Sequence, residues 1–446
     1  MAHICILGNG IAGVTAARHI RKLSEHRITL ISGEASYFFS RTALMYVYMG
    51  HMAWKDLEPY PRTFWQDNRI EILYDMVAAV DFEEKKMILA SGRSVHYDQL
   101  ILATGSVPVR PEWPGQNLRG VGKLYHKQDL EALESWTPQV RQAVIAGGGL
   151  IGIELAEMLH SRGKEVSLLI REPAYWAGVL PMPEANLVSR HILRQGIDLR
   201  QGHQVREIKS HDGERVSSIV TQDGSEIDCQ YLGITIGVRP NIDLFQNSPL
   251  EMDRGILVDS FLRTNLPDVY AIGDCAQLKN PRPGRRSVEA VWYTGRMMGK
   301  TVAKTICGHS EEYDPGIWFN SAKFFDLEYQ VYGQVSPVDP PSIASLYWQH
   351  PNEEKSIRIC YDKASQEVTG FNLMGIRFRQ EICDRWISQK ANLKEVLSSV
   401  RLAFFDPEFY RDHAPQLIRA AREQTGLDVQ LTRPWTLNAV LQFMKK

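Results

Sequence analysis

The sequence has few cysteines, and none of them lie close together in the chain. Six occur among 446 residues, and the nearest pair, Cys360 and Cys383, is 23 residues apart. Zinc sites and dithiol motifs need much shorter spacings, and a disulfide scaffold of this length needs many more cysteines. We therefore expect reduced, mostly buried thiols and no metal site.

Charge of either sign is not in excess, because 51 basic and 52 acidic residues leave a net charge of −1. A near-neutral chain lacks the basic surface typical of nucleic-acid binders, so we expect no nucleic-acid partner. Hydrophobic residues make up 44% of the chain, which is too many for a disordered protein. The length is that of about three ordinary globular domains.

Long hydrophobic runs are also missing. The longest apolar tract, residues 143–159, contains Glu154, Glu157 and four glycines, so its composition is not that of a spanning helix. The first apolar run covers only Ile4–Leu7 and has no basic leader before it. We therefore expect no membrane span and a cytoplasmic location.

Two glycine-rich units are present. Each consists of a predicted strand, a G-x-G-x-x-G turn, a helix and a second strand. In the first unit these four elements cover residues 3–8, 8–13, 14–23 and 28–31. In the second unit they cover residues 142–146, 147–152, 153–161 and 166–170. The turn glycines are Gly8, Gly10, Gly13, Gly147, Gly149 and Gly152. Such a turn lets backbone approach a pyrophosphate at a helix N-terminus. Two copies in full strand–helix–strand context predict two dinucleotide sites.

The residue that follows the second strand of such a unit indicates which nucleotide it binds. Glu34, which lies 21 residues beyond Gly13, suits the ribose hydroxyls of an adenosine. In the second unit the same place holds Arg171 and Glu172. The arginine favours the 2′-phosphate of NADPH and the glutamate favours NADH, so the sequence leaves both open. A solvated Arg–Glu pair with no ligand is the third interpretation.

Three further segments carry a resemblance to a known family. They are YDQLILATGS at residues 97–106, TIGVRPN at residues 235–241 and NLPDVYAIGDCA at residues 265–276. Together with the two glycine turns, in this order, they resemble the two-dinucleotide flavoproteins. That family contains the pyridine nucleotide-disulfide reductases, the rubredoxin and ferredoxin reductases, and the flavin part of nitrite reductase.

The resemblance implies an α/β fold with two Rossmann-like dinucleotide-binding domains and a third domain. An FAD domain over residues 1–112 and 242–308 would be split by an inserted NAD(P)H domain over 113–241. A C-terminal α+β domain over 313–446 would form the interface of a homodimer. Segments 321–327 and 370–375 resemble strands within that domain.

The resemblance also implies the cofactor-binding residues. FAD would contact Gly8, Gly10, Gly13, Glu34, Arg41, Val77, Ala103, Thr104, Gly105, Asp274 and Trp292, the last in a helix starting near Glu289. NAD(P)H would contact Gly147, Gly149, Gly152, Arg171, Glu172 and Gly237. Glu154 is the implied catalytic residue, because the family's glutamate at this place orients the nicotinamide against the flavin. Tyr46 is a possible hydrogen-bond partner for its carboxyl.

One segment argues against thiol chemistry. In the coenzyme A disulfide reductases a redox cysteine lies beside the flavin, and the matching position here is Thr42 in the segment 42–50. A hydroxyl cannot exchange with a disulfide. In the cysteine-free branch a lysine supports the flavin, and its place is taken here by Tyr46.

The implied reaction is hydride transfer from nicotinamide to flavin N5, followed by electron transfer to an external acceptor. That acceptor would be an iron–sulfur or rubredoxin-type protein or a quinone-like small molecule. Arg282, Arg285 and Arg286 form a basic segment that faces either an acidic carrier or solvent. Two alternatives stay open: a thiol, disulfide or peroxide reductase with a displaced cysteine, and a nicotinamide-sensing flavoprotein that acts through a partner.

Replacing Arg171 by alanine tests the nucleotide choice. We expect Arg171→Ala to weaken NADPH binding much more than NADH binding, because only NADPH carries the 2′-phosphate that a guanidinium would hold. Dissociation constants for both nucleotides provide the measurement. Equal losses for the two nucleotides would rule out a phosphate contact.

Overall fold

A computed structural model describes residues 1–405 and 411–432 of the chain. Its first unit contains a five-stranded parallel sheet with the strand order β19-β7-β1-β2-β3. The strands are β1 (His3–Leu7), β2 (Arg27–Ser32), β3 (Ile70–Tyr74), β7 (Gln99–Leu102) and β19 (Val269–Ala271). The sheet therefore joins segments from residue 3 to residue 271 of the chain into one layer.

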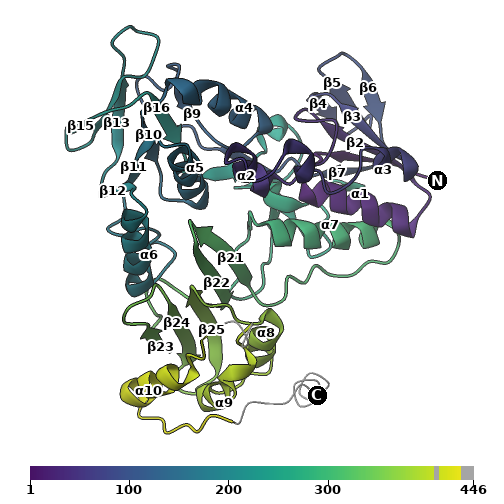
Figure 1. The fold of residues 1–446 in the computed structure, drawn as a ribbon. Coiled ribbons are helices and arrows are strands. Elements are labelled where there is room, and N and C mark those ends of the chain that lie inside the picture. The colour runs from purple at the N-terminus through teal and green to yellow at the C-terminus, as the bar shows by residue number, and fades with distance from the viewer. Residues whose placement is uncertain (406–410, 433–446) are drawn as a thin grey trace.

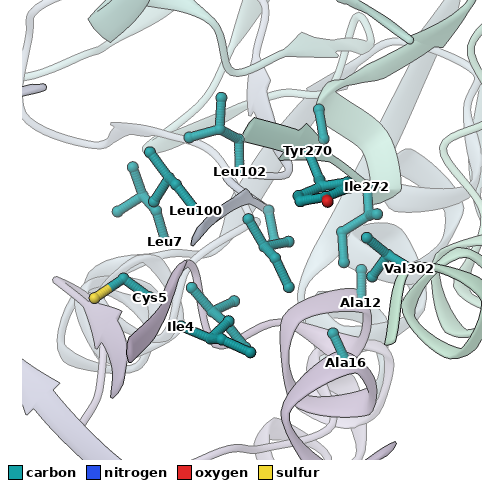
Figure 2. Close-up of a cluster of buried hydrophobic side chains, with 14 of the residues drawn as sticks. Ile4, Cys5, Leu7, Ala12, Ala16, Leu100, Leu102, Tyr270, Ile272 and Val302 are labelled. Carbon is teal, nitrogen blue, oxygen red and sulfur yellow. The ribbon is translucent and has the colours of Figure 1, made fainter. Parts of the chain in front are cut away.

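Two helices, α1 (Ile11–Leu23) and α7 (Trp292–Ile306), lie side by side against this sheet (Figure 1). Gly299 of α7 permits the close approach, because a Cβ there would lie 2.5 Å from the carbonyl oxygen of Ala12. Figure 2 shows the core between sheet and helices, a buried cluster to which Ile4, Leu102 and Val302 belong. Strands buried on both faces explain why the sequence of β1 is apolar without alternation.

A second parallel sheet repeats the design in the order β12-β11-β10-β16-β9. Its strands and helices are β9 (Val121–Gly122), α4 (Lys127–Trp136), β10 (Gln142–Ala146), α5 (Leu150–Ser161), β11 (Glu165–Ile170), α6 (Met182–Arg194), β12 (Asp198–Gln201) and β16 (Tyr231–Ile234). All of these elements lie between residues 121 and 234. The antiparallel pair β8 (Ser106–Pro108) and β17 (Val238–Pro240) connects this unit to the first.

Smaller elements complete the two units. One three-stranded antiparallel sheet is formed by β4 (Val77–Asp81), β5 (Lys86–Leu89) and β6 (Ser94–His96). A second one is formed by β13 (Val205–Lys209), β14 (Ser218–Thr221) and β15 (Glu226–Asp228). A parallel pair is formed by β18 (Ile256–Val258) and β20 (Ala276–Leu278). Two short helices follow β2 at α2 (Leu44–Tyr48) and α3 (Thr63–Asp67).

The third unit is an antiparallel sheet in the order β21-β22-β25-β24-β23 with helices on it. Its elements are β21 (Phe319–Phe324), β22 (Leu327–Gly333), β23 (Ile343–Gln349), β24 (Ser356–Asp362), β25 (Val368–Met374), α8 (Gln380–Ser388), α9 (Leu393–Ser398) and α10 (Ala414–Thr425). The expected C-terminal region runs to residue 446, so its residues 406–410 and 433–446 lie outside the described part.

The expected α/β class with two Rossmann-like units is confirmed. The predicted strand over 142–146 is β10, and the predicted helices start within three residues of α1 and α5. The helix expected near Glu289 begins at Trp292, because Glu289 is held in a buried ion pair with Arg285 and Val291 is extended. None of the helices in the described ranges is long and apolar enough to cross a membrane.

A buried ion pair ties the second unit to the third. Glu184 of α6 is fully buried, and both of its oxygens accept hydrogen bonds from Arg358 of β24, at 2.5 and 2.9 Å. Asn372 of β25 donates a further hydrogen bond to Glu184 at 3.3 Å. Figure 1 shows α6 directly above β23 and β24. Because each charge depends on the other for solvation, loss of one leaves the other buried and unpaired.

We expect Glu184→Ala to lower the free energy of unfolding by about 3–5 kcal/mol, since Arg358 keeps its charge without a partner. The double variant Glu184→Leu with Arg358→Met removes both charges and should recover most of that loss. Urea unfolding of the three proteins, followed by circular dichroism, makes the comparison. A double variant as unstable as the single one would show that packing, and not the charge pair, holds the interface.

Candidate functional site

A cavity lies at the carboxyl ends of β1, β2 and β7, where α/β sheets bind ligands. Its volume is about 940 Å³, within the range of small-molecule sites. The predicted site residues that line it are Gly8, Gly10, Glu34, Arg41, Val77, Ala103, Thr104, Gly105, Glu154, Asp274 and Trp292. Residues from three distant parts of the chain therefore meet around one space.

The first glycine turn forms one wall of this cavity. A Cβ on Gly8 would lie 2.1 Å from the carbonyl oxygen of Ala103, and one on Gly13 would lie 2.0 Å from the carbonyl oxygen of Gly8. These two glycines pack turn, strand and helix together. Gly10 has no atom within 4 Å of its Cβ position and faces the cavity. A side chain there would occupy the space in front of the N-terminus of α1, where an anion is stabilised.

Glu34 follows β2 and is held by a set of donors. Arg41 donates to both carboxylate oxygens, one of them at 3.0 Å, and the backbone N–H of Lys127 donates at 2.9 Å. The ring of His126 lies 3.5 Å from the same carboxylate. Burial alone would raise the pKa of Glu34, but hydrogen bonds from His126 and Arg41 outweigh it and lower the pKa to about 2. Glu34 is therefore ionised at the cavity wall.

Asp274 lies on the opposite wall, after β19. Ser106 donates its hydroxyl proton to Asp274 at 2.8 Å, and Thr104 donates to the backbone oxygen of Asn241 at 2.6 Å. Burial raises the pKa of Asp274 above its usual value, although the Ser106 hydrogen bond opposes the shift. A carboxyl so placed is a ready acceptor for hydroxyl groups of a ligand.

The second glycine turn has the same geometry as the first. A Cβ on Gly147 would lie 2.3 Å from the Thr235 oxygen, and one on Gly152 would lie 2.1 Å from the Gly147 oxygen, while Gly149 meets only one atom within 4 Å. The large cavity is not lined by these glycines, nor by Gly237, Arg171 or Glu172. The helix that follows the turn does reach it, through Leu150, Ile151 and Glu154. Helix α5 thus brings the second unit to the first unit's cavity.

Glu154 is the one carboxyl group of α5 at this junction. Burial raises its pKa to about 7, and the nearby charge of Glu157 adds to the shift. Among the described residues Tyr46 makes no hydrogen bond to Glu154, although both side chains line a second cavity. Glu154 therefore sits where both cavities meet, and it changes protonation near neutral pH.

Arg171 and Glu172 form an exposed pair. The Arg171 Nε donates to Glu172 at 2.8 Å, and the arginine side chain is 74% exposed. This geometry does not choose between NADH and NADPH, since a ligand phosphate and the glutamate compete for the same guanidinium.

The basic segment near β20 is not a free cationic surface. Arg285 is buried in a pair with Glu289 at 2.6 Å and also donates to the backbone of Pro315 and Gly316. Arg282 pairs with Asp314 at 2.8 Å. Of the two interpretations of this segment, the structure therefore argues against a docking cluster of three free arginines, because two of the three guanidiniums neutralise carboxylates of the chain itself.

None of the six cysteines lines the large cavity or the second one. Cys275 is fully buried, its thiol donates to backbone oxygens of Leu102 and Ile272, and burial raises its pKa. A raised pKa keeps the thiol protonated and unreactive. Thr42, at the place of the family's redox cysteine, lines both cavities.

Sequence reasoning missed a segment of the cavity wall. Leu124, Tyr125 and His126, just before α4, and Gln128, in its first turn, line it although they lie within the expected NAD(P)H region. Tyr125 accepts a hydrogen bond from Arg41 through its backbone oxygen, and its hydroxyl accepts one from the backbone N–H of Ser106. No local pattern marks this segment. The segment reaches the cavity because the chain passes there from the first unit to the second.

Two turn-and-helix units that meet at one cavity define an α/β protein that binds two dinucleotides. The family model for pyridine nucleotide-disulphide oxidoreductases matches residues 2–299, and the chain belongs to this family. It is an oxidoreductase of the FAD- and NAD(P)H-dependent class to which the family belongs.

Individual proteins are similar to this chain in sequence or in structure. The chain is 34% identical over 336 residues to the ferredoxin reductase subunit of 5,5'-dehydrodivanillate O-demethylase from Sphingobium, covering 74% of this chain and 80% of that one. It is 30% identical over 329 residues to the nitrite reductase of Bacillus subtilis, covering 73% of this chain but only 40% of that one. A ferredoxin reductase from Rhodopseudomonas palustris superposes with a TM-score of 0.77 at 27% identity, over 84% and 91% of the two chains.

The raised pKa of Glu154 has a consequence for stability. The folded carboxyl keeps its proton up to about pH 7, whereas the unfolded one loses it near 4.5, so the wild-type protein loses stability as the pH rises between these values. We expect Glu154→Gln to escape that loss and to gain about 3 kcal/mol on wild type between about pH 5 and pH 8.

Urea unfolding midpoints at the two pH values give the measurement. The exposed Glu131→Gln of α4 is the control and should show no such pH-dependent gain. A Glu154→Gln protein whose advantage is the same at both pH values would contradict the assignment of a neutral carboxyl.

Proposed function

We propose that the protein is an FAD-containing, NAD(P)H-dependent reductase that passes electrons to an external iron–sulfur protein. One observation carries the proposal: α5, which follows the second glycine turn, presents Leu150, Ile151 and Glu154 to the cavity of the first turn. Two dinucleotides held by these turns would meet with their reactive rings at Glu154. That is the geometry a hydride transfer between them requires.

The cavity residues fit an FAD. The open space at Gly10 and the N-terminus of α1 suit its pyrophosphate, and the ionised Glu34 suits the ribose hydroxyls of its adenosine. Asp274, hydrogen-bonded to Ser106, suits the hydroxyls of the ribityl chain. The remaining contacts would come from Arg41, Val77, Ala103, Thr104, Gly105 and Trp292, all of which line the cavity. A bound FAD accepts hydride from the nicotinamide and releases the electrons to an acceptor.

The second turn would hold NAD(P)H. Its open Gly149 and the N-terminus of α5 suit the pyrophosphate, and Gly237, at a φ of +120°, belongs to the adjoining loop. Arg171 and Glu172 lie just after β11, where the adenosine ribose of a nucleotide would be read. Glu154 would orient the nicotinamide and hold a proton beside the reacting rings.

The proposal of an iron–sulfur acceptor rests on the names of two similar proteins and on the positions of the cysteines. Both the Sphingobium relative and the Rhodopseudomonas structure are named as ferredoxin reductases. The chain spans less than half the length of the Bacillus nitrite reductase, so no activity of that larger protein is carried over. The thiol reductase alternative needs a cysteine beside the flavin, and no cysteine lines either cavity. The homodimer and the cytoplasmic location stay predictions from the sequence.

An anaerobic titration of the FAD-loaded protein with NADH and with NADPH tests the proposal. We expect the flavin absorbance to bleach after one equivalent per FAD with the preferred nucleotide, because no cysteine lines either cavity to take a second electron pair. Re-oxidation by a ferredoxin or rubredoxin, followed in the same cell, should then restore the absorbance.

Two other outcomes are informative. Uptake of a second equivalent with a long-wavelength thiolate band would place a redox cysteine at the flavin. A persistent charge-transfer complex that no iron–sulfur protein re-oxidises would favour the nicotinamide-sensing alternative and overturn the proposal.

A further inference from the structure

A second cavity of about 630 Å³ adjoins the first one. It lies between α2 and α5 on one side and β21, β22 and α8 of the third unit on the other. Thr42, Met45 and Glu154 line both cavities. A molecule in the second cavity would therefore be separated from the proposed flavin site only by the side chains that the two cavities share.

Aromatic rings form much of the wall of this second cavity. They belong to Tyr46, Tyr293, Phe319, Tyr329, Tyr332, Phe378 and Phe405. Tyr293 and Phe319 pack with their centroids 4.6 Å apart, and Tyr293 also contacts Trp292 of the first cavity at 5.6 Å. Rings arranged in this way offer faces and edges to a planar aromatic ligand. The volume is that of a small-molecule site and far too small for a protein acceptor.

The charged groups of the cavity are suited to proton transfer. Glu154 and Glu157 lie one turn apart on α5, and burial raises the pKa of both carboxyls. Lys323 of β21 also lines the cavity, lowers the pKa of Glu157 through its charge and has no ion-pair partner among the described residues. Two carboxyl groups with raised pKa and one ammonium group thus line the same space as the aromatic rings, while Glu328, Arg377 and Glu381 line it from the third unit, where Arg377 pairs with Glu328.

We propose that the second cavity binds a planar aromatic two-electron acceptor of the quinone class, with Glu154 and Glu157 supplying a proton and Lys323 holding a quinone oxygen. The net reaction would be NAD(P)H + H⁺ + quinone → NAD(P)⁺ + hydroquinone. Two electrons and one proton leave the nicotinamide as hydride, and the second proton passes through the carboxyl pair from solvent. An iron–sulfur protein takes one electron at a time and needs no proton donor, so the aromatic wall and the carboxyl pair serve a different acceptor.

This inference rests on the proposed reduction of the flavin by NAD(P)H, but its binding test is independent of turnover. Ala322 of β21 lines the second cavity and not the first, so Ala322→Trp should fill the second one. Isothermal titration of the oxidised, FAD-loaded protein with 2-methyl-1,4-naphthoquinone measures binding without any reductant. We expect one site in wild type and at least about tenfold weaker binding in Ala322→Trp.

Ala344→Trp provides the matched control. Ala344 is also partly buried, but it lies on β23 at the opposite edge of the same sheet and does not line the cavity. Its quinone affinity should equal that of wild type, and both variants should retain their FAD. Absence of quinone binding in wild type, or equal binding in wild type and Ala322→Trp, would overturn the inference.

A second variant tests the proton donor. Quinone reduction needs a proton and ferricyanide reduction does not, so Glu157→Gln should lower the ratio of quinone to ferricyanide turnover by at least about tenfold. The exposed Glu165→Gln at the start of β11 should leave that ratio unchanged. An unchanged ratio in Glu157→Gln would remove Glu157 from the proposal. If NAD(P)H does not reduce the flavin of the wild-type protein, the proposed function itself is overturned. If the flavin is reduced but the quinone does not bind, only this inference is overturned.

Discussion

The close approach of backbone to backbone at the two glycine turns is the constraint on which the rest of the structure depends. At Gly8 and again at Gly147 a neighbouring strand end presents a carbonyl oxygen within 2.3 Å of where a Cβ would stand. Only a residue without a side chain permits that contact, and both positions have φ near +120°. Because these contacts bring turn, strand and helix together, they place the N-termini of α1 and α5 at the edges of the cavity.

Around that frame, acidic side chains differ in protonation because their surroundings differ. Glu34 is surrounded by donors and stays ionised, whereas Glu154 accepts no hydrogen bond from any residue that the structure describes, and burial raises its pKa to about 7. The first environment suits recognition of hydroxyl groups, and the second suits a group that gives and takes a proton. The same residue type therefore serves two purposes within one cavity, as a consequence of burial and hydrogen bonding alone.

The third unit contributes more than a cover. Its sheet is joined to the second unit through the buried pair of Glu184 and Arg358, and its first two strands close the second cavity against α5. In our proposal the acceptor is therefore selected at the boundary between units, where the glycine motifs give no information.

The sequence by itself determined the two dinucleotide units and their order, and it identified several residues around the cavity, since glycine turns and apolar strands have local signatures that do not depend on the rest of the chain. It predicted Glu34, Asp274 and Glu154 as cavity residues through a resemblance that local motifs carry. Only the tertiary structure decided what those carboxyls contact, that Tyr125 and His126 join the wall, that Arg285 is neutralised by Glu289, and that β21 closes a second cavity beside Thr42. These features arise from contacts between segments far apart in the chain, and burial and pairing of a charge are properties of the assembled fold that no local pattern encodes.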